Sequence, residues 1–247
     1  MIRLPSVDEL IDTLEFGENP WDRAKASLDL GDIGDDKALQ PLIQAMLHDD
    51  HDFVRRDSAE ALGLLENPGA VGALIKCMNQ DSFHYARNEA VESLGKIKDP
   101  SATQALIEFM KNDDWDFGRA SAALSLADLK AKEAIPEILQ AIQREPESYV
   151  RKDMLRALHK FRDKSTLEVV YNLLTSDEDW EVRQKAAEIL GWFASPKTVE
   201  KLVITLKTDD NLFVRQEAEK ALQLMARDYR IEWTTAEALL AQKDIFV

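Results

Sequence analysis

An arginine that recurs every 32 residues constrains the fold of this chain more than any other feature of its sequence. The residue seven positions after each arginine is a leucine. The residue three positions after each arginine is small in all repeats but one. Because offsets of 0, 3, 7 and 10 fall on one face of a helix, this half of each repeat is predicted to be an amphipathic α-helix. The arginines are Arg23, Arg55, Arg87, Arg119, Arg151, Arg183 and Arg215.

The other half of each repeat is also predicted to be helical. Positions 16, 19, 20 and 23 after the first arginine are Leu39, Leu42, Ile43 and Met46, and later repeats place mostly apolar residues there. We therefore expect an all-α, right-handed α-solenoid of about seven helix pairs over residues 5–227. A capping helix is expected at about 232–243, because an open end of a repeat array exposes core side chains. The whole chain, residues 1–247, is expected to form a single domain.

An acidic residue stands six positions before every arginine except the first, where Gly17 occupies the position. A planar guanidinium can bridge two acceptors at once, so the two sets predict a ladder that ties each inter-helix corner to the start of the next helix. The alternative is that the arginines bind an anionic ligand. If the pair is buried, Arg119→Ala is expected to cost on the order of 3 kcal/mol. The acids are Asp49, Asp81, Asp113, Glu145, Asp177 and Asp209.

The pattern Asp…Val-Arg…Ala…Leu-Gly, at residues 49–63 and 177–191, resembles HEAT repeats. The 32-residue period is shorter than the ~40 residues usual for such repeats, and it resembles the phycobilisome-lyase-type HEAT-like subfamily. The resemblance implies a non-catalytic scaffold or chaperone whose concave groove binds another protein, such as a phycobiliprotein or a second HEAT-like subunit. It also implies two alternatives: a bilin lyase or lyase-like subunit that takes a linear tetrapyrrole, and a phycobilisome assembly or degradation factor.

Aromatic residues stand two positions before six of the seven arginines, although aromatics make up only 7% of the chain. Aromatic side chains beside a polar rim are typical anchors for a partner protein. Two other interpretations stay open: the rings sandwich a flat ligand such as an open-chain tetrapyrrole, or they fill gaps between successive helix starts. Glu181 interrupts the series, with Trp180 and Trp192 nearby. The candidate binding residues are Trp21, Phe53, Tyr85, Phe117, Tyr149, Trp180, Trp192 and Phe213.

Charge and composition argue against several classes of function. The net charge of −15 disfavours nucleic-acid and anionic-membrane partners, which require clustered Lys and Arg. No apolar stretch approaches the ~18 residues of a membrane span, and the N-terminus lacks the features of a signal peptide. The single Cys77 fits a reducing compartment. A cytoplasmic protein is therefore expected.

No catalytic or metal-binding constellation stands out in the sequence. The segment HDDHD at 48–52 resembles a metal cluster superficially, but it is expected to be a solvated corner in a chain whose corners are all acidic. Cys77 precedes the core residue Met78 and is expected to be a buried, inert thiol. The sequence therefore predicts no catalytic residue, no metal and, outside the tetrapyrrole alternative, no cofactor.

Overall fold

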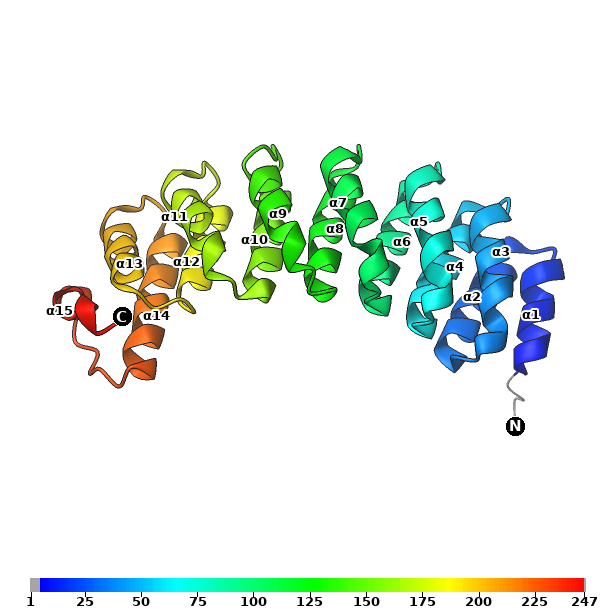
Figure 1. Cartoon of the computed structure of the whole chain (residues 1–247), viewed down its shortest axis with the longest axis horizontal. Coiled ribbons are helices and arrows are strands. Elements are labelled where there is room, and N and C mark those ends of the chain that lie inside the picture. The colour runs from blue at the N-terminus through cyan, green and yellow to red at the C-terminus, as the bar shows by residue number, and fades with distance from the viewer. Residues whose placement is uncertain (1–4, 247) are drawn as a thin grey trace. The chain divides into compact units, whose positions relative to one another are not determined.

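A computed structural model describes residues 5–246, which form α-helices and short 3-10 turns with no β-strand among them. The helices follow one another as seven pairs and a final single helix (Figure 1). They are α1 (Val7–Phe16), α2 (Pro20–Ile33), α3 (Leu39–His48), α4 (Asp52–Leu65), α5 (Val71–Gln80), α6 (His84–Ile97), α7 (Thr103–Asn112), α8 (Asp116–Asp128), α9 (Ile135–Ile142), α10 (Ser148–Phe161), α11 (Leu167–Ser176), α12 (Trp180–Leu190), α13 (Pro196–Thr208), α14 (Leu212–Asp228) and α15 (Ala236–Ala241).

The link from one pair to the next has a recurring construction. The second helix ends at a residue in the left-handed conformation, as at Lys98 after α6, where φ is 59°. An Asp or Asn then accepts a hydrogen bond from the amide two residues later, as Asp99 does from the Ser101 amide at 2.8 Å. A short 3-10 turn leads into the next helix. Because the same turn chemistry recurs after α2, α4, α6 and α10, these links have equal lengths.

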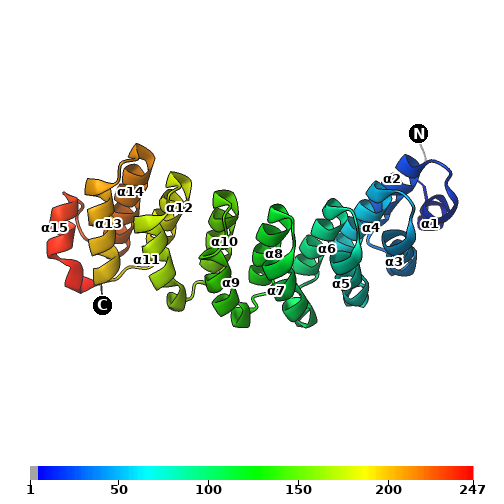
Figure 2. The ribbon, with the colours of Figure 1, turned by 90° about the horizontal axis from the view of Figure 1, so that it is seen from above.

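The core is built from the repeating apolar positions. The leucine seven residues after each arginine is fully buried in all seven repeats. Within each unit, Figure 2 shows the first helices of the pairs in one row and the second helices in another. Each leucine lies on the second helix of its pair and is buried in the core. These residues are Leu30, Leu62, Leu94, Leu126, Leu158, Leu190 and Leu222.

The second helices approach one another more closely than the first helices do. Small residues permit this approach: a Cβ at Gly63 of α4 would lie 2.8 Å from the Ser93 Cβ of α6, and one at Gly31 of α2 would lie 2.9 Å from the Ala61 Cβ of α4. The glycine that follows the leucine thus marks close helix packing at both positions.

The contacts of the chain group into two compact units, Met1–Glu137 and Ile138–Val247. The division falls inside α9, so no loop separates the units. The prediction that the chain forms a single domain stays a prediction.

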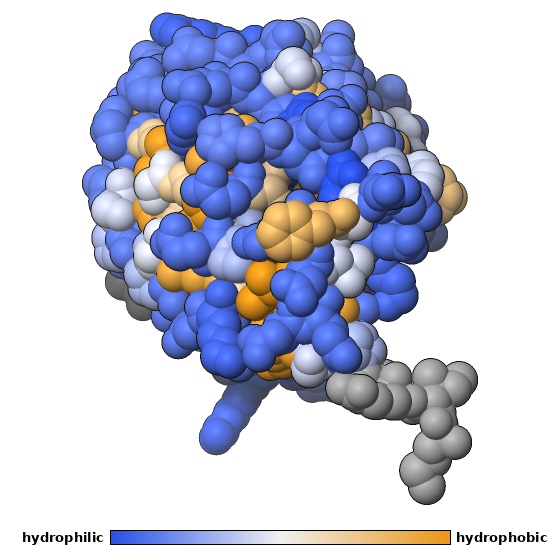
Figure 3. Space-filling model, turned by 90° about the vertical axis from the view of Figure 1, so that its right-hand side faces the viewer, coloured by the Kyte–Doolittle hydropathy of each residue, from blue (hydrophilic) through white to orange (hydrophobic). Residues whose placement is uncertain are grey.

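The two ends of the repeat array differ. At the C-terminal end, Thr235 caps α15 through its hydroxyl, which accepts from the Ala238 amide at 3.1 Å, so the helix is shorter than the expected 232–243. Leu239 and Phe246 are buried there. At the N-terminal end, hydrophobic side chains are exposed between hydrophilic ones (Figure 3), and Phe16 of α1 is 76% exposed. None of the described helices combines the length and the apolar character that crossing a membrane requires.

Candidate partner-binding surface

The arginine side chains link consecutive corners, where a corner is the turn between the two helices of a pair. Arg55 donates from Nε and Nη2 to the carboxylate of Asp81, at 2.7 and 3.0 Å, and from Nη1 to the main-chain carbonyl of Asp49, at 3.1 Å. The carbonyl belongs to the arginine's own corner, and the carboxylate belongs to the next one. The sequence-based prediction joined each arginine to the acid six residues before it. That contact exists through the main chain, whereas the ion pair is made one repeat later.

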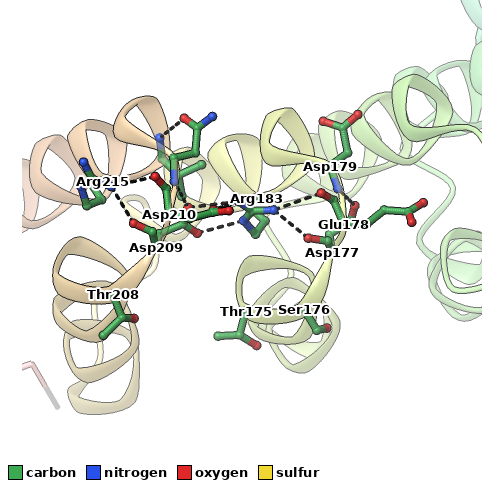
Figure 4. Close-up of polar contacts among 12 residues, drawn as sticks. Thr175, Ser176, Asp177, Glu178, Asp179, Arg183, Thr208, Asp209, Asp210 and Arg215 are labelled. Carbon is green, nitrogen blue, oxygen red and sulfur yellow. Dashed lines mark hydrogen bonds and ion pairs between the residues drawn. The ribbon is translucent and has the colours of Figure 1, made fainter.

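The same double contact recurs in both units. Figure 4 shows it at Arg183, which holds the carboxylate of Asp209 and the carbonyl of Asp177. The Arg119 guanidinium donates to the Asp113 carbonyl at 3.1 Å. The ion pairs, which together form the Arg–acid ladder, are Arg23–Asp49, Arg55–Asp81, Arg87–Asp113, Arg151–Asp177 and Arg183–Asp209.

The first acid position and the last arginine of the ladder differ from the other repeats in the groups that bond there. Gly17 stands where an acid is expected, and its main-chain carbonyl accepts from Arg23 Nη1 at 3.0 Å, as the carbonyls of the acids do in later repeats. Arg215 is the last arginine of the 32-residue series, and the position 26 residues after it is Ala241. It donates to the carbonyls of Asp209 and Asp210, at 2.7 and 3.0 Å (Figure 4).

The ladder is buried and electrically satisfied. The side chains of Arg183 and Asp209 are only 12% and 8% exposed. Burial alone would raise the pKa of Asp209, but hydrogen bonds from Arg183 and from the Asn211 amide outweigh it and hold that pKa below its usual value. A guanidinium committed to a carboxylate and a carbonyl has little capacity left for an anionic ligand. The geometry therefore supports a structural role for this arginine.

Aromatic rings form an unbroken series in the first unit, at the corners where the second helices begin. The centroids are 5.5 Å apart for Trp21 and Phe53, and 5.5 Å for Phe53 and Phe83. The next distances are 5.2 Å for Phe83 and Tyr85, 5.1 Å for Tyr85 and Trp115, and 5.4 Å for Trp115 and Phe117. His51 lies against both Trp21 and Phe53. We call these seven side chains the ring line: Trp21, His51, Phe53, Phe83, Tyr85, Trp115 and Phe117.

The sequence analysis missed three members of the ring line: His51, Phe83 and Trp115. They occupy the N-cap positions of α4, α6 and α8, four residues before each ladder arginine, and none makes a side-chain capping hydrogen bond. Comparison of the repeats could have found these three rings, because they stand at the N-cap position that Asn or Asp occupies in other repeats. Those caps are Asn19, Asp179 and Asn211.

The two kinds of ring have different exposures. The N-cap rings are half-buried and fill the space between neighbouring rings. Trp21, Tyr85 and Phe117 remain 60%, 49% and 55% exposed, although they contact neighbouring rings. Filling gaps between helix starts therefore accounts for the N-cap rings, while about half of the surface of Trp21, Tyr85 and Phe117 stays open to a partner.

The second unit holds the remaining candidate residues, and they do not all come together. Trp180 and Phe213 lie 5.5 Å apart at the starts of α12 and α14, so Trp180 supplies the ring that Glu181 does not. Glu181 instead bonds to Lys152. Tyr149 is half-buried near the start of α10. Trp192 follows the opposite end of α12, beside His159 at 6.0 Å, and is therefore remote from the corner rings.

The HDDHD segment has structural partners at most of its positions. Asp49 and Asp50 bond to Arg23, and Asp52 bonds to Arg55 at 2.6 Å. His51 belongs to the ring line. The described residues contain no group of three or more His, Cys, Asp or Glu side chains placed to hold a metal ion.

Cys77 is buried between α5 and α6, where its thiol lies 3.7 Å from the Ala86 carbonyl oxygen. Burial, and secondarily the charge of Asp81, raises the pKa of this thiol to about 12. A thiol that stays protonated at neutral pH is a poor nucleophile and a poor metal ligand.

The geometry of paired helices, Arg–acid ladder and glycine contacts can now be compared with known proteins. The HEAT repeat family matches residues 5–63, 42–127 and 135–223. The chain belongs to the HEAT-repeat family. Residues 118–144 also match the PBS lyase HEAT-like repeat. No curated protein sequence matches the chain.

Solved structures share the fold of this HEAT-repeat protein. The CpcE–CpcF complex of phycocyanin lyase from Nostoc sp. PCC7120 is similar at 22% identity and a TM-score of 0.57, covering 97% of this chain and 94% of that one. The karyopherin Kap121p, bound to the extreme C-terminus of the phosphatase Cdc14p, is similar at 14% identity and a TM-score of 0.72, covering 96% of this chain and 31% of that one.

Kap95p, in a structure with RanGDP, is similar at 18% identity and a TM-score of 0.61, covering 89% of this chain and 34% of that one. The chain thus spans about a third of the length of Kap121p and Kap95p. In each of the three structures the similar chain is in a complex with another protein.

Proposed function

We propose that this HEAT-repeat protein is a non-catalytic scaffold or chaperone that binds a partner protein through the ring line. One observation carries the proposal: three consecutive second helices have an aromatic residue in place of a capping side chain. A missing cap costs about 1 kcal/mol of stability. The three N-cap rings instead pack against the more exposed rings of the row, and local rules that are broken together in one region are typical of functional sites.

The exposure of the rings supports a protein as the partner. Trp21, Tyr85 and Phe117 are each about half exposed and belong to one row of contacting rings. Aromatic side chains of this kind dominate the binding energy of protein interfaces. The three solved structures described above, each a complex with another protein, are consistent with such a role.

Pull-down from a native lysate tests the proposal. The test bait carries Trp21→Ala, Tyr85→Ala and Phe117→Ala, which remove the most exposed rings and leave the buried leucines in place. The control bait carries Trp180→Ala and Phe213→Ala, the ring pair of the second unit. We expect the test bait to lose specific partners that the wild type and the control bait retain, while all three give the same circular dichroism spectrum. Equal recovery by all baits would assign the rings to packing alone.

A second candidate is a bilin lyase subunit, or an assembly or degradation factor of phycobilisomes. It is favoured by the PBS lyase HEAT-like repeat at residues 118–144 and by the similarity to CpcE–CpcF over almost the whole chain. The ring geometry is less favourable to it. Inserting a flat pigment between two rings requires about 7 Å, twice a carbon–carbon contact distance, whereas neighbouring rings of the line are 5.1–5.8 Å apart.

Titration with a linear tetrapyrrole separates the two candidates. A shift of its visible absorbance that is lost in the Trp21→Ala/Tyr85→Ala/Phe117→Ala variant would support the pigment role. The absence of any shift, together with capture of a phycobiliprotein on the ring line, would support an antenna chaperone that does not bind the pigment.

A further inference from the structure

We propose that the ring line binds an extended, basic segment of its partner, about eight residues long. This inference rests on the proposed function and specifies the chemistry of the partner. It follows from three features of the corners: their excess of exposed carboxylates, the way a guanidinium already lies against one ring, and the length of the row.

The ladder leaves one exposed carboxylate uncompensated at alternate corners of the first unit. Arg23 bonds to both Asp49 and Asp50, whose side chains are 9% and 90% exposed. Arg87 likewise bonds to Asp113 and Asp114, which are 8% and 89% exposed. One guanidinium shared by two carboxylates leaves a net charge of −1. The solvent-exposed carboxylates, Asp50 and Asp114, directly precede His51 and Trp115 of the ring line in sequence.

Further acids add to the negative charge along the ring line. Asp52 precedes Phe53 and is 54% exposed, although it bonds to Arg55. Asp22 follows Trp21 and is exposed. The nearby cation Lys25 is committed to Asp29, one turn along its own helix. The surface beside the rings therefore attracts cationic groups, and a basic segment complements it.

Arg56 shows how a partner's side chain would lie. Its guanidinium carbon is 4.8 Å from the centroid of the Phe53 ring, and its Nε donates to Asp57 at 2.6 Å. A cation thus contacts a ring of the line while bonding to a carboxylate. Lysine and arginine side chains of a partner can repeat this arrangement, with the aliphatic stem on a ring and the charge beside Asp50 or Asp114.

The length of the row fixes the length of the segment. The steps from Trp21 to Phe117 are 5.1–5.5 Å between centroids, so the row is no longer than about 27 Å. An extended chain rises about 3.3 Å per residue, so about eight residues cover the row. Side chains alternate between the two faces of such a chain, so about four of them contact rings. A single file of rings matches one extended strand better than a broad, flat interface.

The test uses three fluorescein-labelled eight-residue peptides with blocked ends and fluorescence anisotropy with the full-length protein. One peptide alternates lysine with leucine, and the others have glutamine or glutamate in place of lysine. We expect the lysine peptide to bind at least about tenfold more tightly than the other two, because only it complements the carboxylates.

Matched variants locate the site. The variant Asp50→Asn/Asp114→Asn removes the two exposed carboxylates that lie 27 residues after Arg23 and Arg87. The control Glu178→Gln/Asp210→Asn removes two exposed carboxylates of the second unit. They lie 27 residues after Arg151 and Arg183 and are 88% and 89% exposed. We expect about fivefold weaker binding of the lysine peptide for the first variant and less than twofold for the control.

The outcomes separate this inference from the proposed function. Equal binding of the lysine and glutamine peptides, or equal effects of the two double variants, would overturn the basic-segment inference. So would a failure of every peptide to bind while the lysate pull-down still depends on the rings, because the partner would then present a folded surface. If the ring variant captures the same proteins as the wild type, the proposed function itself fails.

Discussion

At the scale of single residues, the ladder arginines differ in the groups they bond to, so replacing different arginines has different consequences. Arg183 neutralises the buried Asp209, whereas Arg215 bonds only to main-chain carbonyls. Removing one partner of a buried ion pair leaves an uncompensated charge, which is more costly than losing a neutral hydrogen bond.

We therefore expect Arg183→Ala to lower the free energy of unfolding by about 3 kcal/mol, and Arg215→Ala to lower it by about 1 kcal/mol. Urea unfolding followed by circular dichroism measures both. Equal losses in the two variants would contradict the assignment of the ion pair as the stronger contact.

Glu89 is a partly buried acid, with 18% of its side chain exposed, whose ionisation opposes folding. Burial, and next the charge of Glu92, raises its pKa to about 7, with Glu60 adding to the effect and Lys96 opposing it from 3.6 Å. An unfolded glutamate titrates near 4.3, so between about pH 4.3 and 7 the folded state binds more protons than the unfolded state. Stability is therefore expected to fall as the pH rises through this window and then to level off.

The variant Glu89→Gln removes this titration. Relative to the variant, the wild type should lose up to about 3 kcal/mol of unfolding free energy between pH 5 and pH 8. Urea unfolding at the two pH values measures the difference. Parallel behaviour of the two proteins would show that Glu89 does not titrate in this range.

At the scale of the helices, glycine has opposite roles in the two rows. A Cβ at Gly63 in the second-helix row would lie 2.9 Å from the Ser93 main-chain Cα, which cannot move aside without displacing α6. A Cβ at Gly72, in the first-helix row, meets nothing within 4 Å. Gly63→Ala is expected to destabilise by about 2 kcal/mol, and Gly72→Ala to stabilise by up to about 1 kcal/mol. Thermal unfolding checks both signs, and a stabilised Gly63→Ala would refute the close packing.

Helix capping is the other element-scale feature, and its cost can be measured away from the ring line. Glu147 occupies the N-cap of α10 without a capping hydrogen bond, whereas Asn211 caps α14 and accepts from the Phe213 amide at 2.8 Å. We expect Glu147→Asn to raise the free energy of unfolding by about 1 kcal/mol and Asn211→Ala to lower it by a similar amount. No gain from Glu147→Asn would weaken the argument that the aromatic N-caps sacrifice stability.

At the scale of the whole molecule, the boundary between the two units falls inside α9. Domain boundaries usually fall in exposed linkers, so a continuous helix at this point favours cooperative unfolding of the chain. We expect a single calorimetric transition whose van't Hoff and calorimetric enthalpies agree. Two separate transitions would show that the units unfold independently and would replace the single-domain prediction.

The sequence alone was enough to determine the helix pairs, their order and the residues of their core. These follow from short-range rules: helical spacing places Ser58 and Leu62 on one face of α4, and turn residues such as Asp99 end one pair and begin the next. The repeat also made the arginines and acids recognisable as one structural device. Periodicity within a chain is a local property, and it can be read without knowing which repeats touch.

The tertiary structure alone decided which residues pair across repeats. The carboxylate partner of Arg55 is Asp81, 26 residues away, rather than Asp49 in its own corner. The ring line likewise combines two sets of positions, because Phe83 reaches both Phe53 of the previous repeat and Tyr85 of its own. Such contacts depend on the stacking of one repeat against the next, which sets distances between residues that no spacing within a single repeat specifies.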